Sequence, residues 1–245
     1  MRIVWFDSLD STNSEALRRL PSLETPVVLA AREQTAGRGQ RGNSWFSAPG
    51  QNLTFSIVLR FEQDALPVAD AVWLNYLSAL VVADYVENLG VGCSVKWPND
   101  IYAGRDKLCG MLIENSLEGS CVAASVIGIG LNMNQQEFPQ LARATSVSRC
   151  TGDHYDLEES LETLAERFEE ALPALFDPSR RSALFDRYTA RLFQKDVRAR
   201  YRDLLSGREF DGLIRGVAPD GRLLLEDAAT GALLRYRFKE VGYIL

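Results

Sequence analysis

A chain of 245 residues with 46% hydrophobic and 24% charged residues can hold one sizeable core plus a small appendage, and this composition excludes an intrinsically disordered protein. The formal net charge of −6 argues against a nucleic-acid binder that works through a basic face, so no DNA partner is expected. The most apolar stretch, residues 71–83, contains Asn75 and Ser78 and is too short to span a bilayer, so no membrane partner is expected.

The cysteines and the first residues indicate a cytoplasmic protein. The four cysteines form no Cys-x-x-Cys pair and His154 is the single histidine, so a zinc site of the usual kind is not expected. Reduced thiols without a special role are the simpler interpretation. We find no signal peptide, because the first strand-like run, residues 3–6, leads directly into polar residues.

Hydrophobic patterns predict interleaved strands and helices up to residue 193. Strands are predicted at residues 3–6, 27–31, 52–59, 94–97, 107–115 and 122–130, with the last two forming a hairpin. Thr12 to Glu15 fits a capping box at the start of a short helix. Longer helices are predicted at residues 67–89, 157–176 and 179–193, and the first should be buried around most of its circumference.

The pattern changes after Lys195. Polar and apolar residues alternate at residues 234–238, and tight turns are indicated at residues 219–221 and 230–231. These signals are typical of a small antiparallel barrel. We therefore predict an α+β protein with a main domain at residues 1–195 and a β domain at residues 196–245.

The loop at residues 37–45 is the first candidate binding segment. It carries three glycines and two arginines within six residues and ends at Trp45. Glycine lets backbone N–H groups approach an anion, arginine offers forked donors to phosphate or carboxylate, and tryptophan can stack on a purine. A solvent-exposed hairpin loop with solubilising charges has the same composition, so the loop alone does not decide its function.

The corner from Lys96 to Asp100 is the second candidate. Pro98 fixes the chain, so Asn99 and Asp100 should lie at a defined point directly after a strand. A carboxylate beside an amide and a lysine can hold Mg²⁺ and triphosphate oxygens. A turn in which Asn and Asp satisfy their own backbone is the common alternative.

Two strand ends carry further candidates. Lys107 begins a mostly apolar strand, where its charge can stabilise an anionic intermediate, and Gly110 permits close approach of a ligand. Otherwise Lys107 is a solvated strand end. Gly128 and Gly130 precede Asn132, whose amide can recognise an adenine edge.

The predicted helix start at Ser11-Thr12-Asn13 is the last candidate, because hydroxyl and N–H groups there can bind a polar ligand. Helix capping by Thr12 is the alternative.

Taken in this order, the segments resemble those of the biotin protein ligases, and the resemblance extends over essentially the whole chain. The segments that carry it are Ser11-Thr12-Asn13, Gln34 to Gly42 with Trp45, Lys96-Trp97-Pro98-Asn99-Asp100, Lys107 with Gly110 and Glu114, and Gly128 to Asn132. The resemblance implies a mixed-sheet catalytic domain, akin to class II aminoacyl-tRNA synthetases and lipoate ligases, followed by an SH3-like domain.

The resemblance also implies roles for the biotin-binding residues. The ureido ring of biotin would be bound by Ser11, Thr12, Asn13 and Gln34. The loop that orders over biotinyl-adenylate would comprise Arg38, Gly39 and Gln40, with Gly110 beside the ligand. Lys107 would contact the biotin carboxylate and the α-phosphate. The chain departs from the family at Gln40, where the loop often carries a basic residue.

The remaining implied roles concern ATP. Adenine would be held by Trp45 and Asn132. The triphosphate and Mg²⁺ would be served by Arg41, Lys96, Asn99 and Asp100, with Asp100 as the metal ligand. The residues expected to act in catalysis are Lys107, Arg38 and Asp100.

The activity implied is formation of biotinyl-5′-AMP from biotin and ATP, followed by transfer of biotin to a lysine of a biotin carboxyl carrier domain of acetyl-CoA carboxylase or a related carboxylase. Such chemistry needs positioning and charge neutralisation more than a side-chain nucleophile. A weak homodimer is left open. Because the biotin motif starts at Ser11, we expect the form without an N-terminal DNA-binding domain.

Two alternatives stay open at this point. A lipoate ligase or octanoyltransferase shares the implied fold and an active-site lysine. A biotin-sensing or DNA-binding regulator would bind without forming AMP.

Overall fold

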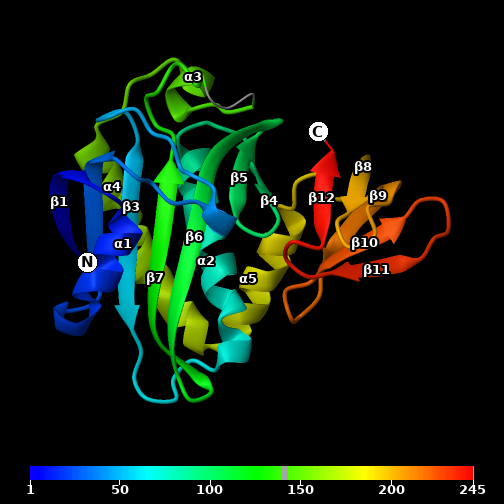
Figure 1. Cartoon of the computed structure of the whole chain (residues 1–245), viewed down its shortest axis with the longest axis horizontal. Coiled ribbons are helices and arrows are strands. Elements are labelled where there is room, and N and C mark those ends of the chain that lie inside the picture. The colour runs from blue at the N-terminus through cyan, green and yellow to red at the C-terminus, as the bar shows by residue number, and fades with distance from the viewer. Residues whose placement is uncertain (140–142, 245) are drawn as a thin grey trace.

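Two β-sheets organise the chain (Figure 1). The computed structural model describes residues 1–139 and 143–244, and the side chain of Arg41 lies outside this description. The larger sheet has seven strands in the order β1-β2-β3-β7-β6-β5-β4, and the smaller sheet has five in the order β11-β10-β9-β8-β12. This arrangement confirms the predicted α+β fold.

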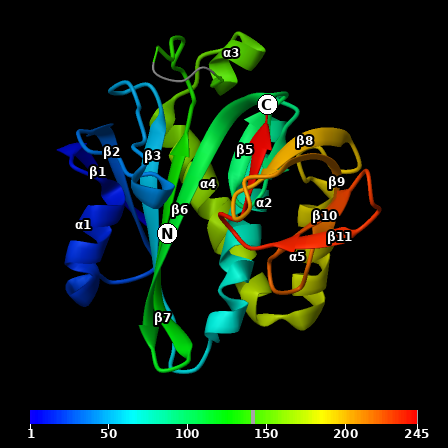
Figure 2. The same ribbon diagram turned by 45° about the vertical axis from the view of Figure 1, so that its right-hand side comes forward.

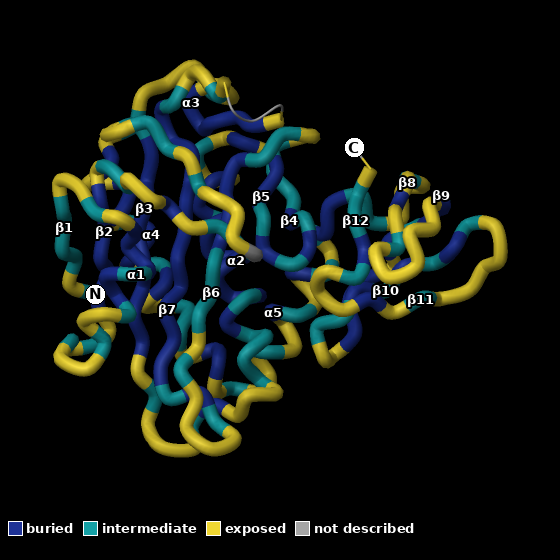
Figure 3. Tube along the Cα trace, in the orientation of Figure 1, coloured by how far each residue is buried: buried dark blue, intermediate teal, exposed yellow. Residues whose placement is uncertain are grey.

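The larger sheet is mixed, because β1 and β2 pair in parallel while every other neighbouring pair is antiparallel. Its strands are β1 (Arg2–Leu9), β2 (Val27–Gln34), β3 (Leu53–Arg60), β4 (Ser94–Lys96), β5 (Asp100–Ala103), β6 (Asp106–Glu118) and β7 (Cys121–Leu131). The predicted hairpin is formed by β6 and β7, which pair along nearly their full length. Strands β3 and β7 lie at the centre and are the most buried (Figure 3).

Helices cover both faces of this sheet (Figure 2). On one face, α1 (Thr12–Arg19) packs Ala16 against Val27 and Leu29 of β2. The alternate residues of β2, Val28 and Ala30, belong to the main core on the other face. That face is covered by α2 (Val72–Asn88), α4 (Leu157–Ala171) and α5 (Pro178–Ala190), while α3 (Val147–Thr151) lies at one end of the sheet.

The long helices follow the predictions with changes at their ends. Helix α2 is preceded by a separate 3₁₀ turn at Val68–Asp70 and is buried on most sides, as its narrow polar stripe predicts. Helix α4 ends at Ala171 and continues as a 3₁₀ turn at Leu172–Phe176, because Pro173 lacks the N–H that an α-helix needs. No helix in the described part of the chain is long and apolar enough to cross a membrane.

The predicted capping box at Thr12 is wrong. Helix α1 is preceded by Ser11 as the N-cap residue, and no side chain caps it. Thr12 is already helical and its hydroxyl donates to Gln34 instead. Glu15 pairs with Arg18 and Arg19. A tertiary partner thus occupies the Thr12 hydroxyl, and arginines one turn along the same helix occupy the Glu15 carboxylate.

The smaller sheet comprises β8 (Arg198–Asp203), β9 (Glu209–Val217), β10 (Leu223–Asp227), β11 (Leu233–Tyr236) and β12 (Val241–Ile244). The predicted tight turns connect β9 to β10 and β10 to β11, with Gly221 and Gly231 at positive φ. The sheet contacts the main unit through Trp97, whose Nε1 donates to the Gly221 carbonyl at 3.0 Å and whose ring lies 6.0 Å from that of Phe238. A domain boundary at residue 195 stays a prediction.

Helix α5 supports the corner at Pro98, and this contact can be tested. The Tyr188 hydroxyl donates to the Pro98 carbonyl at 2.5 Å, and Asn75 Nδ2 donates to the same oxygen at 2.7 Å. Since the carbonyl keeps one donor, we expect Tyr188→Phe to lower the free energy of unfolding by only about 1 kcal/mol. Urea denaturation measures this change, and a loss above about 3 kcal/mol would contradict shared support of the corner.

Candidate active site

A cavity of about 660 Å³ lies where the two sheets meet the loop at residues 37–46. Most of the residues predicted from the sequence line it, and these are Ser11, Thr12, Asn13, Gln34, Arg38, Gly39, Gln40, Trp45, Lys96, Asn99, Asp100, Lys107 and Gly110. They come from β1–α1, β2, β4–β5, β6 and the loop. The fold therefore brings segments that are far apart in the sequence into one site.

The cavity floor is formed by glycines of β6 and β7. Gly110 and Gly130 are register partners, and Gly128 lies opposite Leu112. A Cβ on Gly128 would lie less than 3.0 Å from the Asn13 side chain, and one on Gly130 equally close to the Trp45 ring. The Gly-x-Gly pattern of β7 predicted close approach of a ligand, and the structure shows that the side chains of Asn13 and Trp45 approach these glycines closely.

One end of the cavity is a buried network of uncharged polar groups. Gln34 Oε1 accepts from the Thr12 backbone N–H at 2.8 Å and from its hydroxyl at 3.2 Å. The Ser56 hydroxyl, which is fully buried in β3, lies 2.8 Å from Thr12 Oγ1 and 2.6 Å from Asn13 Oδ1. Sequence reasoning missed Ser56, although a serine inside the mostly apolar run of β3 was an available signal.

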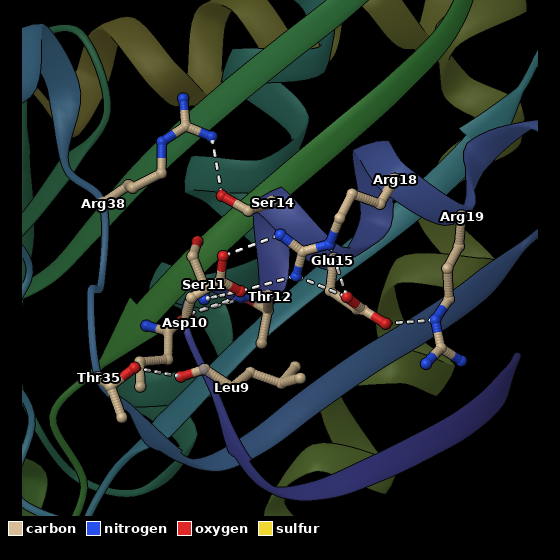
Figure 4. A network of polar contacts seen from close by, with 11 residues as sticks. Leu9, Asp10, Ser11, Thr12, Ser14, Glu15, Arg18, Arg19, Thr35 and Arg38 are labelled. Carbon is tan, nitrogen blue, oxygen red and sulfur yellow. Dashed lines mark hydrogen bonds and ion pairs between the residues drawn. The ribbon is translucent and has the colours of Figure 1, made fainter.

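The turn into α1 is held by Asp10 and Arg18 (Figure 4). Arg18 donates to both carboxylate oxygens of Asp10 at 2.8 Å, and Asp10 Oδ1 also accepts from the Ser11 N–H. The Arg18 guanidinium lowers the pKa of Asp10 to about 2. This pairing fixes the backbone from which Ser11, Thr12 and Asn13 enter the cavity.

The loop at residues 37–46 is fastened over the site by side chains. Arg38 makes two hydrogen bonds to Glu114 of β6, at 2.7 and 3.1 Å, and Asn13 Nδ2 donates to the same carboxylate at 2.9 Å. Gln40 Nε2 donates to Asn99 Oδ1 at 2.8 Å and to the Met111 carbonyl at 3.1 Å. Glu114 belongs to a motif noted in the sequence, but its role as the partner of Arg38 was not foreseen.

The opposite end of the cavity is cationic. Lys107 Nζ pairs with Asp100 at 2.8 Å and lies 5.7 Å from the centre of the Trp45 ring. Lys96 Nζ donates to the Tyr102 hydroxyl at 3.0 Å. Burial lowers the pKa of Lys96, and the nearby Asp100 partly opposes this. The two lysines and Arg38 supply the fixed positive charge of the site.

Of the predicted site residues whose side chains the structure describes, Asn132 does not line the cavity. Asn132 is buried and donates to the Thr145 carbonyl at 2.9 Å, while its Oδ1 has no hydrogen-bond partner within the described residues. Trp45 Nε1 also lacks a partner there. The predicted role of Arg41 falls on a side chain outside the described part. These assignments stay predictions.

The smaller sheet adds residues that sequence reasoning missed. Phe238, Lys239 and Tyr243 line the cavity, as does Leu204 from the turn after β8. No short motif marked them, because they reach the site only through packing of the two sheets. Among the described residues, no three Asp, Glu, His or Cys side chains gather as a resident metal site requires.

A polar end, a glycine floor and a cationic end suit an elongated ligand with an acidic group. The sequence profile of the Biotin/lipoate A/B protein ligase family matches residues 5–132, which is just over half of the chain. A "Biotin--[acetyl-CoA-carboxylase] ligase" of Paracoccus denitrificans is 38% identical over 170 residues, covering 65% of this chain and 68% of that protein. This chain belongs to the biotin/lipoate A/B protein ligase family.

Similarity to further proteins supports the assignment of this chain to the family. The "Bifunctional ligase/repressor BirA" of Escherichia coli (strain K12) is 32% identical over 221 residues, covering 89% of this chain and 67% of that protein. The structure of a biotin protein ligase from Aquifex aeolicus in complex with biotin and ATP superposes with a TM-score of 0.77. That likeness covers 98% of this chain and 97% of the other, at 24% identity, and supports the shared fold.

The fastening of the loop in this family member is testable. In Glu114→Gln the charge that holds Arg38 is removed, so we expect trypsin to cleave after Arg38 several-fold faster. The ion pair is partly exposed, so the free energy of unfolding should change by less than about 1 kcal/mol. Glu118→Gln is a matched control on the same strand. Equal cleavage of the wild type and Glu114→Gln would contradict the role of Glu114.

Proposed function

We propose that this protein is an ATP-dependent biotin protein ligase, which forms biotinyl-5′-AMP and then transfers biotin to a lysine of a carrier protein. The observation that carries the proposal is one cavity that joins an uncharged hydrogen-bonding end to a cationic end across a glycine floor. Biotin has the matching order of groups, namely a urea, an apolar ring with its chain, and a carboxylate. The names of the relatives support the same activity.

The polar end favours biotin over lipoate. The urea of biotin offers two N–H donors and one carbonyl acceptor, and we propose that Ser11, Thr12, Asn13 and Gln34 bind it. The dithiolane ring of lipoate makes no comparable hydrogen bonds. Lipoate would therefore lack the hydrogen bonds that biotin gains at this end, and each of these is worth about 0.5–1.5 kcal/mol.

The first reaction step requires charge neutralisation. The biotin carboxylate oxygen attacks the α-phosphorus of ATP, an anhydride bond forms, and pyrophosphate leaves. Lys107 and Arg38 would neutralise the carboxylate and the α-phosphate as they approach each other, which is the main task in phosphoryl transfer. The ion pairs of Lys107 with Asp100 and of Arg38 with Glu114 hold both cations in place beforehand.

In the second step a carrier lysine amine attacks the acyl carbon, AMP leaves, and the amine proton passes to solvent or phosphate. Because the acyl-phosphate is already activated, the protein needs no nucleophile of its own. We propose as the acceptor the biotin carboxyl carrier domain of acetyl-CoA carboxylase or a related carboxylase, in line with the name of the Paracoccus relative.

We propose that Trp45 and Asn132 hold adenine, and that Arg41, Lys96, Asn99 and Asp100 serve the triphosphate. The unpartnered Nε1 of Trp45, a residue that lines the cavity, supports the assignment of Trp45. Magnesium would arrive on ATP. It commonly binds such phosphates with one or two carboxylates and water, so the single carboxylate of Asp100 fits this requirement.

The activity is tested by incubating the protein with MgATP, an isolated biotin carrier domain, and either biotin or lipoate. We expect mass spectrometry to find one lysine of the carrier modified by biotin and no modification by lipoate. The carrier with that lysine changed to arginine is the control. Preferential attachment of lipoate would replace this proposal with a lipoate ligase.

Lys107→Ala tests the proposed charge neutralisation. We expect the rate of biotin-dependent AMP formation to fall by about 10²–10³-fold, since one fixed charge at the reacting centre is lost. Circular dichroism should show an intact fold. Lys195→Ala, which removes an ion-paired lysine outside the cavity, is the control. A rate close to that of the wild type would refute the role of Lys107.

A further inference from the structure

Lys96 is held differently from the other cations of the cavity. Arg38 and Lys107 pair with carboxylates, whereas no described carboxylate pairs directly with Lys96. Its ammonium nitrogen lies 4.8 Å from the centre of the Tyr102 ring and 4.9 Å from that of Tyr243. Two aromatic faces therefore position a positive charge without neutralising it.

The two rings come from different sheets. Tyr102 is on β5 of the larger sheet, and Tyr243 is on β12, the last strand of the smaller one. Tyr243 is fixed by its neighbours, since its ring lies 6.2 Å from Phe193 and 5.4 Å from Tyr201. The position of Lys96 thus depends on how the C-terminal sheet packs.

The hydroxyl group of Tyr243 is a second unusual feature. Tyr243 lines the cavity, and its hydroxyl is buried with no hydrogen-bond partner of normal geometry within the described residues. The Trp97 backbone N–H is directed at the hydroxyl oxygen, so the O–H proton is what lacks an acceptor. The Tyr243 hydroxyl is thus a buried donor beside the ammonium of Lys96, which no described carboxylate pairs with, and such a pair of groups can bind an oxygen anion.

We propose that Tyr243 is a positioning residue for the nucleotide: its ring holds the Lys96 ammonium toward the polyphosphate of ATP, and its hydroxyl donates to a phosphate oxygen. The inference rests on the proposed ligase function and adds a residue of the C-terminal sheet to the phosphate subsite. It also gives that sheet a part in the first reaction step.

The test is biotin-dependent exchange of labelled pyrophosphate into ATP, which reports the first step alone. Tyr243→Phe keeps the ring and loses the hydroxyl, so we expect the KM for ATP to rise about tenfold. Tyr243→Leu also loses the ring, and we expect a further rise of about threefold. The KM for biotin should stay within about twofold, because the biotin end of the cavity is untouched.

Lys96→Met separates positioning from general packing. If the ring acts through Lys96, Tyr243→Phe and Tyr243→Leu should have the same KM for ATP once Lys96→Met is present. Tyr236→Phe is the control, since it alters a buried tyrosine of the same sheet that bonds Asp203 and lies outside the cavity. It should change stability without changing either KM.

The outcomes are distinct. An unchanged KM for ATP in both Tyr243 variants overturns the inference, as do equal increases in both KM values with a lowered melting temperature, which indicate packing alone. If Tyr243→Leu does not fold, the KM values for ATP of Tyr243→Phe and Lys96→Met decide whether the inference holds. Wild-type protein without any biotin-dependent exchange refutes the ligase proposal itself, and the inference falls with it.

Discussion

The site depends on a strip of sheet that carries no side chains. Gly128 and Gly130 of β7 leave the space that Asn13 and Trp45 occupy, and any Cβ there would overlap them. Because β7 is the central strand of the main sheet and β6 is its neighbour, the floor lies on the buried core of the protein. A helix start and a loop from distant parts of the sequence can therefore meet over one surface. The glycines that look flexible in the sequence are here the condition for a precise cavity.

Above this floor lies a local group of positive charges, although the protein as a whole is acidic. Each cation has a partner that orders it before any ligand enters: Glu114 for Arg38, Asp100 for Lys107, and aromatic rings for Lys96. Ordering of this kind removes an entropic cost from binding and from the reaction. The carboxylates also keep the empty cavity from being strongly cationic. Under the proposed function, the carboxylate and phosphates of the ligands would replace Glu114 and Asp100 as partners of these cations.

The sequence was sufficient for the fold class and for most cavity residues, since glycine, proline and charged residues at strand ends have local causes that a single chain displays. It failed where a side chain chooses a distant partner. Thr12 was predicted to cap its helix, yet its hydroxyl joins Gln34 and Ser56 from neighbouring strands. Tyr243 was not considered at all, because only the packing of the C-terminal sheet brings it beside Lys96. Such contacts are determined by tertiary packing and cannot be predicted from the spacing of residues in the sequence.

The central claim is that ordered cations stabilise an acyl-phosphate bridge within the cavity. It is tested most directly by mixing stoichiometric protein with biotin and magnesium ATP labelled in the α-phosphate, without any acceptor, and separating the products after a quench. The account predicts accumulation of labelled biotinyl-5′-AMP up to about one molecule per active site, with binding energy concentrated on this species. Binding of biotin without any labelled adenylate would contradict it.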